Sequence, residues 1–134
     1  MSQTSLESML SEANQIIKRL DFSETENIIK NTNHVIIDVR EESEVQSHGL
    51  IKNAIHIPRG LIEFKLKPYS YDNPVNIDDD TNILVYCAGG YRSALAAQTL
   101  VSLGFNNVYN IGGFGEWVTN CLLYTSDAAD DTPC

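Results

Sequence analysis

Short runs of hydrophobic residues alternate along the chain with segments whose hydrophobic residues recur at helical spacing. Four runs rich in β-branched residues predict buried strands at 35–39, 54–57, 83–86 and 108–111. Helices are predicted over 60–66, from Ser93 to Leu103 with Gly104 at its end, and from Phe114 onward. Strands that alternate with helices in this way indicate an α/β fold with a parallel sheet.

Two further helices are predicted before the first strand. Hydrophobic residues recur at helical spacing from Leu6 to Leu20, and Thr4 with Glu7 fits a capping box ahead of them. We expect this helix to pack on its own domain, although its apolar stripe also suits a partner-binding helix. Ser23 with Glu26 repeats the capping pattern and predicts a second, shorter helix.

The chain divides into three segments. We expect residues 1–20 to form an N-terminal helix packed on the domain, and residues 21–120 to form the α/β domain itself. Residues 121–134 lack a helical or strand period and resemble the translated read-through of a sequencing-library adapter. We therefore expect this last segment to be a non-native tail, and assign no role to its cysteines.

Composition narrows the class of protein. A length of 134 residues with 43% hydrophobic and 20% charged residues suits one globular domain. The net charge of -9, without a basic stripe, argues against a nucleic-acid partner. The first twenty residues contain no secretory signal or membrane span, so we expect a cytoplasmic protein with no membrane partner. The three cysteines lack CxxC spacing, so no metal site is expected.

The candidate chemistry lies in the loop Cys87-Ala88-Gly89-Gly90-Tyr91-Arg92, between a predicted strand and the helix that Ser93 opens. Ligands of parallel sheets bind at the carboxyl ends of strands, where Cys87 is placed. The glycine pair lets backbone amides turn toward the sulfur, and the helix N-terminus and Arg92 add positive potential. Because these features favour the thiolate, Cys87 is the candidate nucleophile.

A lowered thiol pKa has two opposing effects on reactivity. A fall of about two units raises the thiolate fraction about 25-fold at neutral pH. The same fall lowers the intrinsic nucleophilicity about tenfold. The net gain in attack rate is small, so the loop matters more for stabilising an anionic covalent adduct, such as a persulfide, on Cys87.

Four motifs, in order along the chain, resemble those of the single-domain rhodanese sulfurtransferases. They are Asp38-Val39-Arg40-Glu41 with Glu44, the segment 48–58, the loop 87–93, and the segment 112–117. The resemblance implies a rhodanese-like three-layer sandwich, in which a five-stranded parallel sheet is flanked by helices. It also implies an enzyme similar to thiosulfate sulfurtransferase, with no metal or organic cofactor.

The resemblance further implies a ping-pong transfer through Cys87. The thiol would take sulfane sulfur from thiosulfate, mercaptopyruvate or a polysulfide and pass it to cyanide or a thiol, including a protein thiol. Arg92 would assist an anionic donor, and Arg59 would provide a further anion contact. The backbone amides from Ala88 to Ser93 would bind the persulfide. The supporting ion pairs would come from Asp38, Arg40 and Glu44.

Two alternatives stay open. A non-catalytic or redox-sensing rhodanese-like module usually lacks the loop cysteine, which this chain retains. Phosphatases and arsenate reductases of the same fold place one more residue between cysteine and arginine than the four that separate Cys87 from Arg92. By this resemblance, the shorter loop suits one sulfur atom beyond Cys87 better than a phosphate group.

Overall fold

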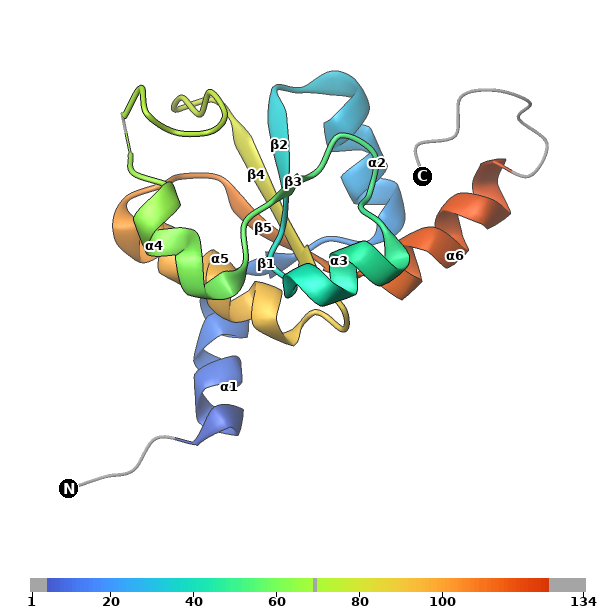
Figure 1. The fold of residues 1–134 in the computed structure, drawn as a ribbon, viewed down its shortest axis with the longest axis horizontal. Coiled ribbons are helices and arrows are strands. Elements are labelled where there is room, and N and C mark those ends of the chain that lie inside the picture. Colours follow the sequence, from blue (N-terminus) through green and yellow to red (C-terminus); the bar gives the residue numbers. More distant parts are fainter. Residues whose placement is uncertain (1–4, 69, 126–134) are drawn as a thin grey trace.

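The computed structural model describes residues 5–68 and 70–125 and contains one parallel sheet (Figure 1). The strands follow the order β1-β5-β4-β2-β3 across the sheet. Their bounds are β1 (Lys18–Arg19), β2 (His34–Asp38), β3 (Ile55–His56), β4 (Asn82–Cys87) and β5 (Val108–Gly113). The predicted α/β fold with a five-stranded parallel sheet is confirmed.

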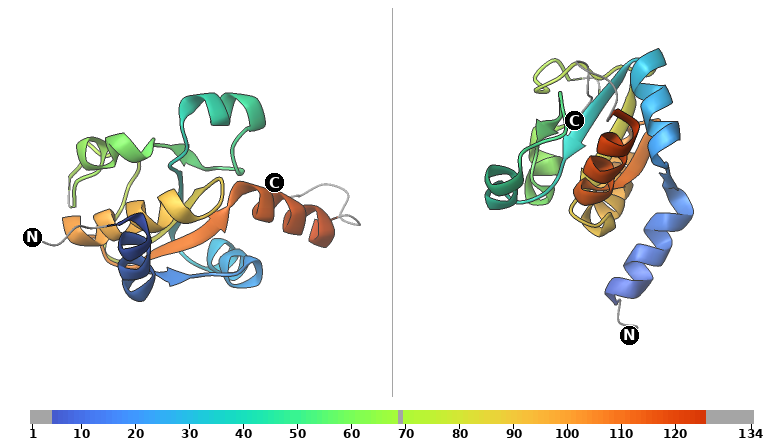
Figure 2. Two further views of the ribbon diagram at one scale, coloured as in Figure 1. Left: turned by 90° about the horizontal axis from the view of Figure 1, so that it is seen from below. Right: turned by 90° about the vertical axis from the view of Figure 1, so that its right-hand side faces the viewer.

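Helices flank the sheet on both faces. They are α1 (Leu6–Ile16), α2 (Phe22–Asn31), α3 (Glu42–His48), α4 (Ile62–Lys65), α5 (Tyr91–Leu103) and α6 (Phe114–Thr125), with a 3-10 turn η1 (Arg59–Leu61). In the right-hand view of Figure 2, α3 and α4 lie on one side of the sheet and α2 lies on the other. The arrangement is a three-layer sandwich.

Strand β4 separates two hydrophobic clusters, because successive side chains of a strand point to opposite faces. Ile83, Val85 and Cys87 belong to the cluster covered by α4 and α5. Leu84 and Tyr86 belong to the cluster on the opposite face. A strand buried on both faces requires a continuous apolar run, which explains why β4 lacks polar alternation.

Trp117 anchors α6 in the second cluster. Its side chain is 3% exposed, and its ring centroid lies 4.7 Å from that of Phe22 on α2. The indole Nε1 is buried without a hydrogen-bond partner. Trp117 is therefore a core residue that joins the first and last parts of the domain.

The N-terminal segment differs from the prediction in where its first helix ends. The helix α1 stops at Ile16, and Lys18–Arg19 pair with β5 as the edge strand β1. Two consecutive basic residues carry no strand signal, so this strand was not predicted. The predicted capping boxes were wrong as well, because Ser5 caps α1 with Ser8 and Asp21 caps α2 with Glu24. Thr4 lies outside the described residues.

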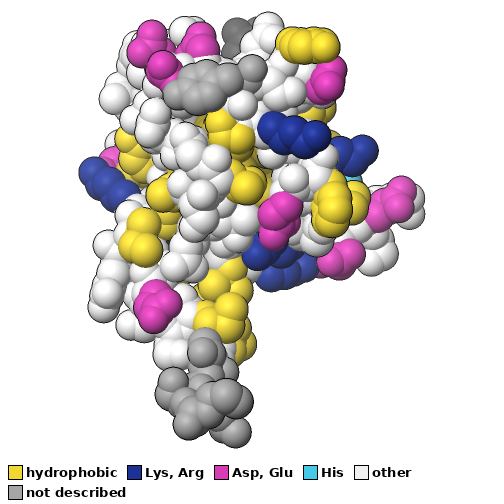
Figure 3. Space-filling model, turned by 90° about the vertical axis from the view of Figure 1, so that its left-hand side faces the viewer, with side chains coloured by type: hydrophobic (Ala, Val, Ile, Leu, Met, Phe, Trp, Pro, Cys, Tyr) yellow, Lys and Arg dark blue, Asp and Glu magenta, His cyan; other side chains and the backbone are white. Residues whose placement is uncertain are grey.

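Only part of α1 packs on the domain. Ala13 and Ile17, close to the carboxyl end of the helix, are buried. Leu6, Met9 and Ile16 are 61%, 42% and 57% exposed. Figure 1 shows the helix extending from the body of the domain, and Figure 3 shows hydrophobic side chains along the extension. The predicted packing is therefore limited to one face near its carboxyl end.

The last helix continues beyond the predicted domain boundary. It runs to Thr125, although residues 121–125 show no helical period, and Cys121 on this helix is buried. Residues 126–134 lie outside the described part of the chain, so the non-native tail stays a prediction. Among the described residues, no helix combines the length and apolar character needed to cross a bilayer.

Candidate active site

Cys87 is the last residue of β4, and its sulfur is enclosed by the beginning of α5. The Sγ atom accepts hydrogen bonds from the backbone N–H groups of Gly90 (3.0 Å) and Ser93 (3.4 Å). The residue is 1% exposed. The helix begins at Tyr91, two residues earlier than predicted, which places its first turn directly against the sulfur.

Gly90 makes this approach possible. It is the N-cap of α5 and has a φ angle of 94°, in the left-handed region that favours glycine. A Cβ atom there would lie 3.2 Å from Nη1 of Arg19 and 3.4 Å from the backbone of Gly112. Any other residue at this position would therefore be strained and would disturb the loop.

Two influences on the pKa of Cys87 oppose each other. Burial is the larger single influence, and it raises the pKa because the thiolate loses water. Hydrogen bonds from the Ser93 hydroxyl and backbone, and then from the Gly89 and Gly90 backbone, lower it. Together the hydrogen bonds outweigh burial, so the pKa of Cys87 lies below its ordinary value and the thiolate is favoured.

Asn110 is a site residue that the sequence did not predict. This side chain on β5 is 2% exposed, and its Oδ1 accepts hydrogen bonds from the Ser93 hydroxyl (2.8 Å) and the Gly112 backbone (2.9 Å). Its Nδ2 donates to the carbonyl oxygen of Gly90 at 3.0 Å. Asn110 therefore ties the loop to the neighbouring strand. The sequence feature that could have indicated it is a polar residue inside the apolar run 108–111. A buried amide needs hydrogen-bond partners, so such a residue is expected to bind neighbouring groups.

The Ser93 hydroxyl has one proton and two acceptors within reach. It donates to Asn110, and its oxygen also lies 3.4 Å from the Cys87 sulfur. While Cys87 is a thiol, its S–H can donate to the Ser93 oxygen. Once the thiolate forms, the hydroxyl proton can turn to the sulfur, which makes Ser93 a stabiliser of the charged form.

Ser93→Ala is expected to raise the pKa of Cys87. The substitution removes the hydroxyl, while the backbone N–H groups of Gly90 and Ser93 still reach the sulfur. The rate of alkylation by iodoacetamide, followed against pH, should shift to higher pH. Ser102→Ala, an exposed change on the same helix, is the matched control. An unchanged profile in Ser93→Ala would contradict the role of the hydroxyl.

Glu44 and Arg92 form a bidentate ion pair beside the loop. Nη1 of Arg92 donates to Oε1 of Glu44 at 2.6 Å, and Nη2 donates to Oε2 at 2.9 Å. The hydrogen bond from Arg92 is the main reason that the pKa of Glu44 is lowered to about 2. The same pair raises the pKa of Arg92. Both side chains are therefore charged at neutral pH.

Asp38 and Arg40 form a second, fully buried pair. Nη2 of Arg40 lies 2.7 Å from Oδ2 of Asp38 and also donates to the carbonyl oxygen of Gly49 at 2.6 Å. The guanidinium carbon lies 4.3 Å from the ring centroid of Phe114 at the start of α6. Burial tends to lower the pKa of Arg40, but its bonds with Asp38 raise it overall. The three predicted supporting residues thus belong to two separate pairs, because Asp38 pairs with Arg40 and Glu44 pairs with Arg92.

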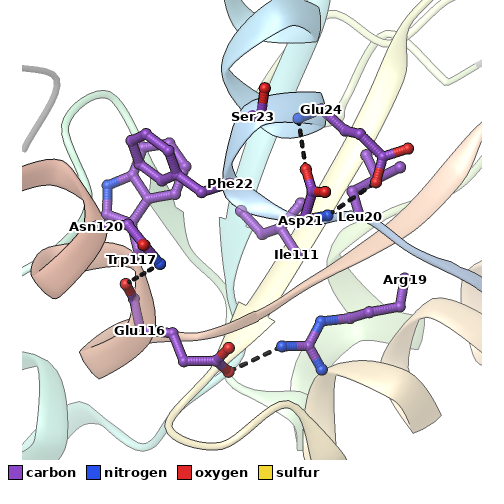
Figure 4. A pocket seen from close by; sticks show the side chains of 10 residues that line it. All are labelled: Arg19, Leu20, Asp21, Phe22, Ser23, Glu24, Ile111, Glu116, Trp117 and Asn120. Atoms are coloured by element: carbon purple, nitrogen blue, oxygen red, sulfur yellow. Dashed lines mark hydrogen bonds and ion pairs between the residues drawn. The ribbon is translucent and has the colours of Figure 1, made fainter. Parts of the chain in front are cut away.

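The two remaining arginines pair with carboxylates outside the loop, and Arg19 also lies against the loop residue Gly90. Arg59 donates to Thr99 (3.0 Å) and pairs with Glu63 (3.4 Å), and its predicted anion contact stays a prediction. Arg19 pairs with Glu116 at 2.8 Å and lies against Gly112. Figure 4 shows that pair beside a cavity of about 450 Å³, whose lining residues do not include Cys87. Arg19 was not predicted as a residue near the loop, because the hydrophobic pattern predicted a helix that continues to Leu20.

The described residues contain no group of three or more histidine, cysteine, aspartate or glutamate side chains that could hold a metal ion.

Comparisons with known proteins place the chain in a family. The family model described as rhodanese-like domain matches residues 21–120. The chain is 36% identical over 101 residues to thiosulfate sulfurtransferase GlpE of Coxiella burnetii, covering 75% of this chain and 86% of that protein. It is 31% identical over 112 residues to a mouse thiosulfate sulfurtransferase/rhodanese-like domain-containing protein 3, covering 76% of this chain and 69% of the relative.

One similar solved structure carries a different functional suggestion. It is a protein of unknown function from Rhodopseudomonas palustris, described as a possible tyrosine phosphatase. The TM-score is 0.76 with 36% identity, and the match covers 90% of this chain and 96% of that one. The match thus includes nearly the whole length of both chains.

Proposed function

Because this chain belongs to the rhodanese-like domain family, we propose that it is a sulfurtransferase that carries sulfane sulfur as a persulfide on Cys87. Relatives named thiosulfate sulfurtransferase support a sulfurtransferase-type activity. The observation that carries the proposal is the enclosure of the sulfur by the N–H groups of Gly90 and Ser93. Those groups stabilise negative charge on Cys87 before and after it reacts.

The first step loads the enzyme. The Cys87 thiolate attacks the outer sulfur of a donor such as thiosulfate, forming a new S–S bond. The S–S bond of thiosulfate breaks, and sulfite leaves with the electron pair. The first N–H groups of a helix have no intrahelical acceptor. Those of Tyr91 and Arg92 are therefore left for the outer sulfur of the persulfide anion, in addition to the two on Sγ.

The second step releases the sulfur. A thiolate or cyanide attacks the outer sulfur of the persulfide, the Cys87–S bond breaks, and the electron pair returns to Cys87. With cyanide the product is thiocyanate. The two half-reactions share one intermediate, so ping-pong kinetics are expected. Mercaptopyruvate and polysulfides are further candidate donors, and a protein thiol is a candidate acceptor.

The activity is tested by supplying thiosulfate, mercaptopyruvate or a polysulfide with cyanide and measuring thiocyanate. Double-reciprocal plots at several cyanide concentrations should be parallel, because donor and acceptor react in separate steps. A purified, folded protein that produces no thiocyanate from any of the three donor classes would contradict the proposal.

A phosphatase is the second candidate, supported by the description of the Rhodopseudomonas palustris structure. A phosphatase would use the same thiolate on a phosphate ester, so Cys87→Ser would abolish either activity. The discriminating measurement is hydrolysis of an aryl phosphate. We expect none above the Cys87→Ser background, because the Arg92 guanidinium is already held by Glu44. Hydrolysis that depends on Cys87 would favour the phosphatase.

A further inference from the structure

Arg92 is the charged residue of the active loop, and its guanidinium is paired with a carboxylate in the structure. Both terminal nitrogens of its guanidinium are engaged by the two carboxylate oxygens of Glu44, at 2.6 and 2.9 Å. This fork-to-fork geometry is the strongest form of the arginine–carboxylate bond. Because the pKa of Glu44 is about 2, the carboxylate stays ionised at any working pH of the protein. The pair therefore carries no net charge.

The surroundings do not replace the missing positive charge. A second carboxylate, Glu41, acts electrostatically on Arg92. The other three arginines of the described chain are also ion-paired: Arg40 with Asp38, Arg59 with Glu63, and Arg19, which lies against Gly90 of the loop, with Glu116. The loop residues from Ala88 to Tyr91 are uncharged. A donor that approaches Cys87 therefore meets a site whose loop cation is already neutralised.

The charge of the donor then determines its access. Thiosulfate brings two negative charges to the site, and sulfite leaves as a dianion while the new persulfide keeps the single charge of the thiolate. An alkyl persulfide carries at most one negative charge. The Cys87 thiolate attacks its terminal sulfur, the S–S bond breaks, and an alkyl thiolate leaves with the electron pair. Like charges that face each other across a site disfavour binding, and a free guanidinium would favour the dianion.

We propose that Glu44, by holding Arg92, sets the donor specificity of this site against dianionic thiosulfate and in favour of alkyl persulfides. This role rests on the proposed sulfurtransferase activity, and it makes Glu44 a specificity-determining residue as well as a support of the loop. It also explains why the loop places an arginine next to the sulfur and then neutralises it. The thiolate is still favoured, because the hydrogen bonds from Ser93 and from the Gly89 and Gly90 backbone lower the pKa of Cys87.

The test compares Glu44→Gln with Glu42→Gln. Both changes remove one negative charge from α3. Glu44 accepts a hydrogen bond from Arg92, whereas Glu42 accepts one from Gln46. Glutamine keeps an amide oxygen for Arg92 and for the backbone N–H of Glu41, which Glu44 accepts at 3.1 Å. The readout is the ratio of kcat/KM for thiosulfate to kcat/KM for an alkyl persulfide, with cyanide as the acceptor.

Glu44→Gln should raise this ratio about tenfold, since a unit charge close to a dianion has an effect of this order near a protein surface. The increase should shrink as salt is added, because ions screen exposed charges. Glu42→Gln should change the ratio less than about twofold, since surface charges without a close partner have small effects. Arg92→Gln should lower the ratio, because it leaves Glu44 unpaired.

A purely structural role of Glu44 would slow both donors alike and leave the ratio unchanged, which would overturn the proposal. An equal rise in Glu42→Gln would overturn it too, because the effect would then follow overall charge. Either of these results would be obtained while the wild-type enzyme still transfers sulfur, so each would overturn the role of Glu44 alone. A wild-type protein that takes sulfur from neither donor would instead contradict the sulfurtransferase activity, and the specificity role with it.

Discussion

Cys87→Ser should abolish sulfur transfer, with a loss of kcat on the order of 10³-fold or more. A hydroxyl is a far weaker nucleophile than a thiolate at neutral pH, and no persulfide can form on oxygen. The measurement is thiocyanate production from thiosulfate and cyanide, with protein concentrations matched to the wild type.

The same substitution should leave the fold intact. Serine is close in size to cysteine, and its hydroxyl can occupy the hydrogen-bond positions that Gly90 and Ser93 offer to the sulfur. The thermal midpoint of unfolding should therefore shift by only a few degrees. Activity retained in a folded Cys87→Ser protein would show that another group carries the reaction.

Asp38→Ala should produce the largest loss of stability. Asp38 is fully buried and Arg40 is 2% exposed, so removing the carboxylate leaves a guanidinium charge uncompensated inside the protein. Breaking a buried pair in this way costs about 3–5 kcal/mol of unfolding free energy. For a chain of this size, the loss corresponds to roughly 10–20 °C in Tm. Urea unfolding monitored by circular dichroism measures it.

Lys30→Ala is the matched control for Asp38→Ala. It also breaks an ion pair, with Glu26 at 3.5 Å, but the Lys30 side chain is 67% exposed. A pair at the surface contributes about 0.3–0.5 kcal/mol when its residues are four apart on a helix. Equal losses in the two variants would show that burial of the Asp38–Arg40 pair has no special effect.

The sheet and the position of Cys87, the candidate nucleophile, were predictable because their signals are local. The segments around β2 and β4 are continuous apolar runs, and Gly104 marks the end of α5. These features follow from the burial of both faces of a parallel strand and from the backbone freedom of glycine. The edge strand β1 was missed because Lys18 and Arg19 form it through pairing with distant β5.

The partners within the site were harder to predict because they come from residues far apart in the sequence. Asn110 follows Ser93 by 17 positions, and Arg92 lies 48 positions beyond Glu44. The family resemblance implied that Asp38, Arg40 and Glu44 all support the loop through ion pairs. The structure separates them into a buried pair and a pair beside the loop. That separation underlies the specificity proposed for Glu44.

Intact-mass spectrometry of the protein after treatment with thiosulfate or polysulfide tests most directly whether Cys87 carries sulfur. We expect a gain of one sulfur atom per chain, located at Cys87 by peptide mapping. Addition of cyanide should then remove it as an equal amount of thiocyanate. A wild-type protein that gains no sulfur, or a Cys87→Ser protein that gains the same sulfur, would contradict the account.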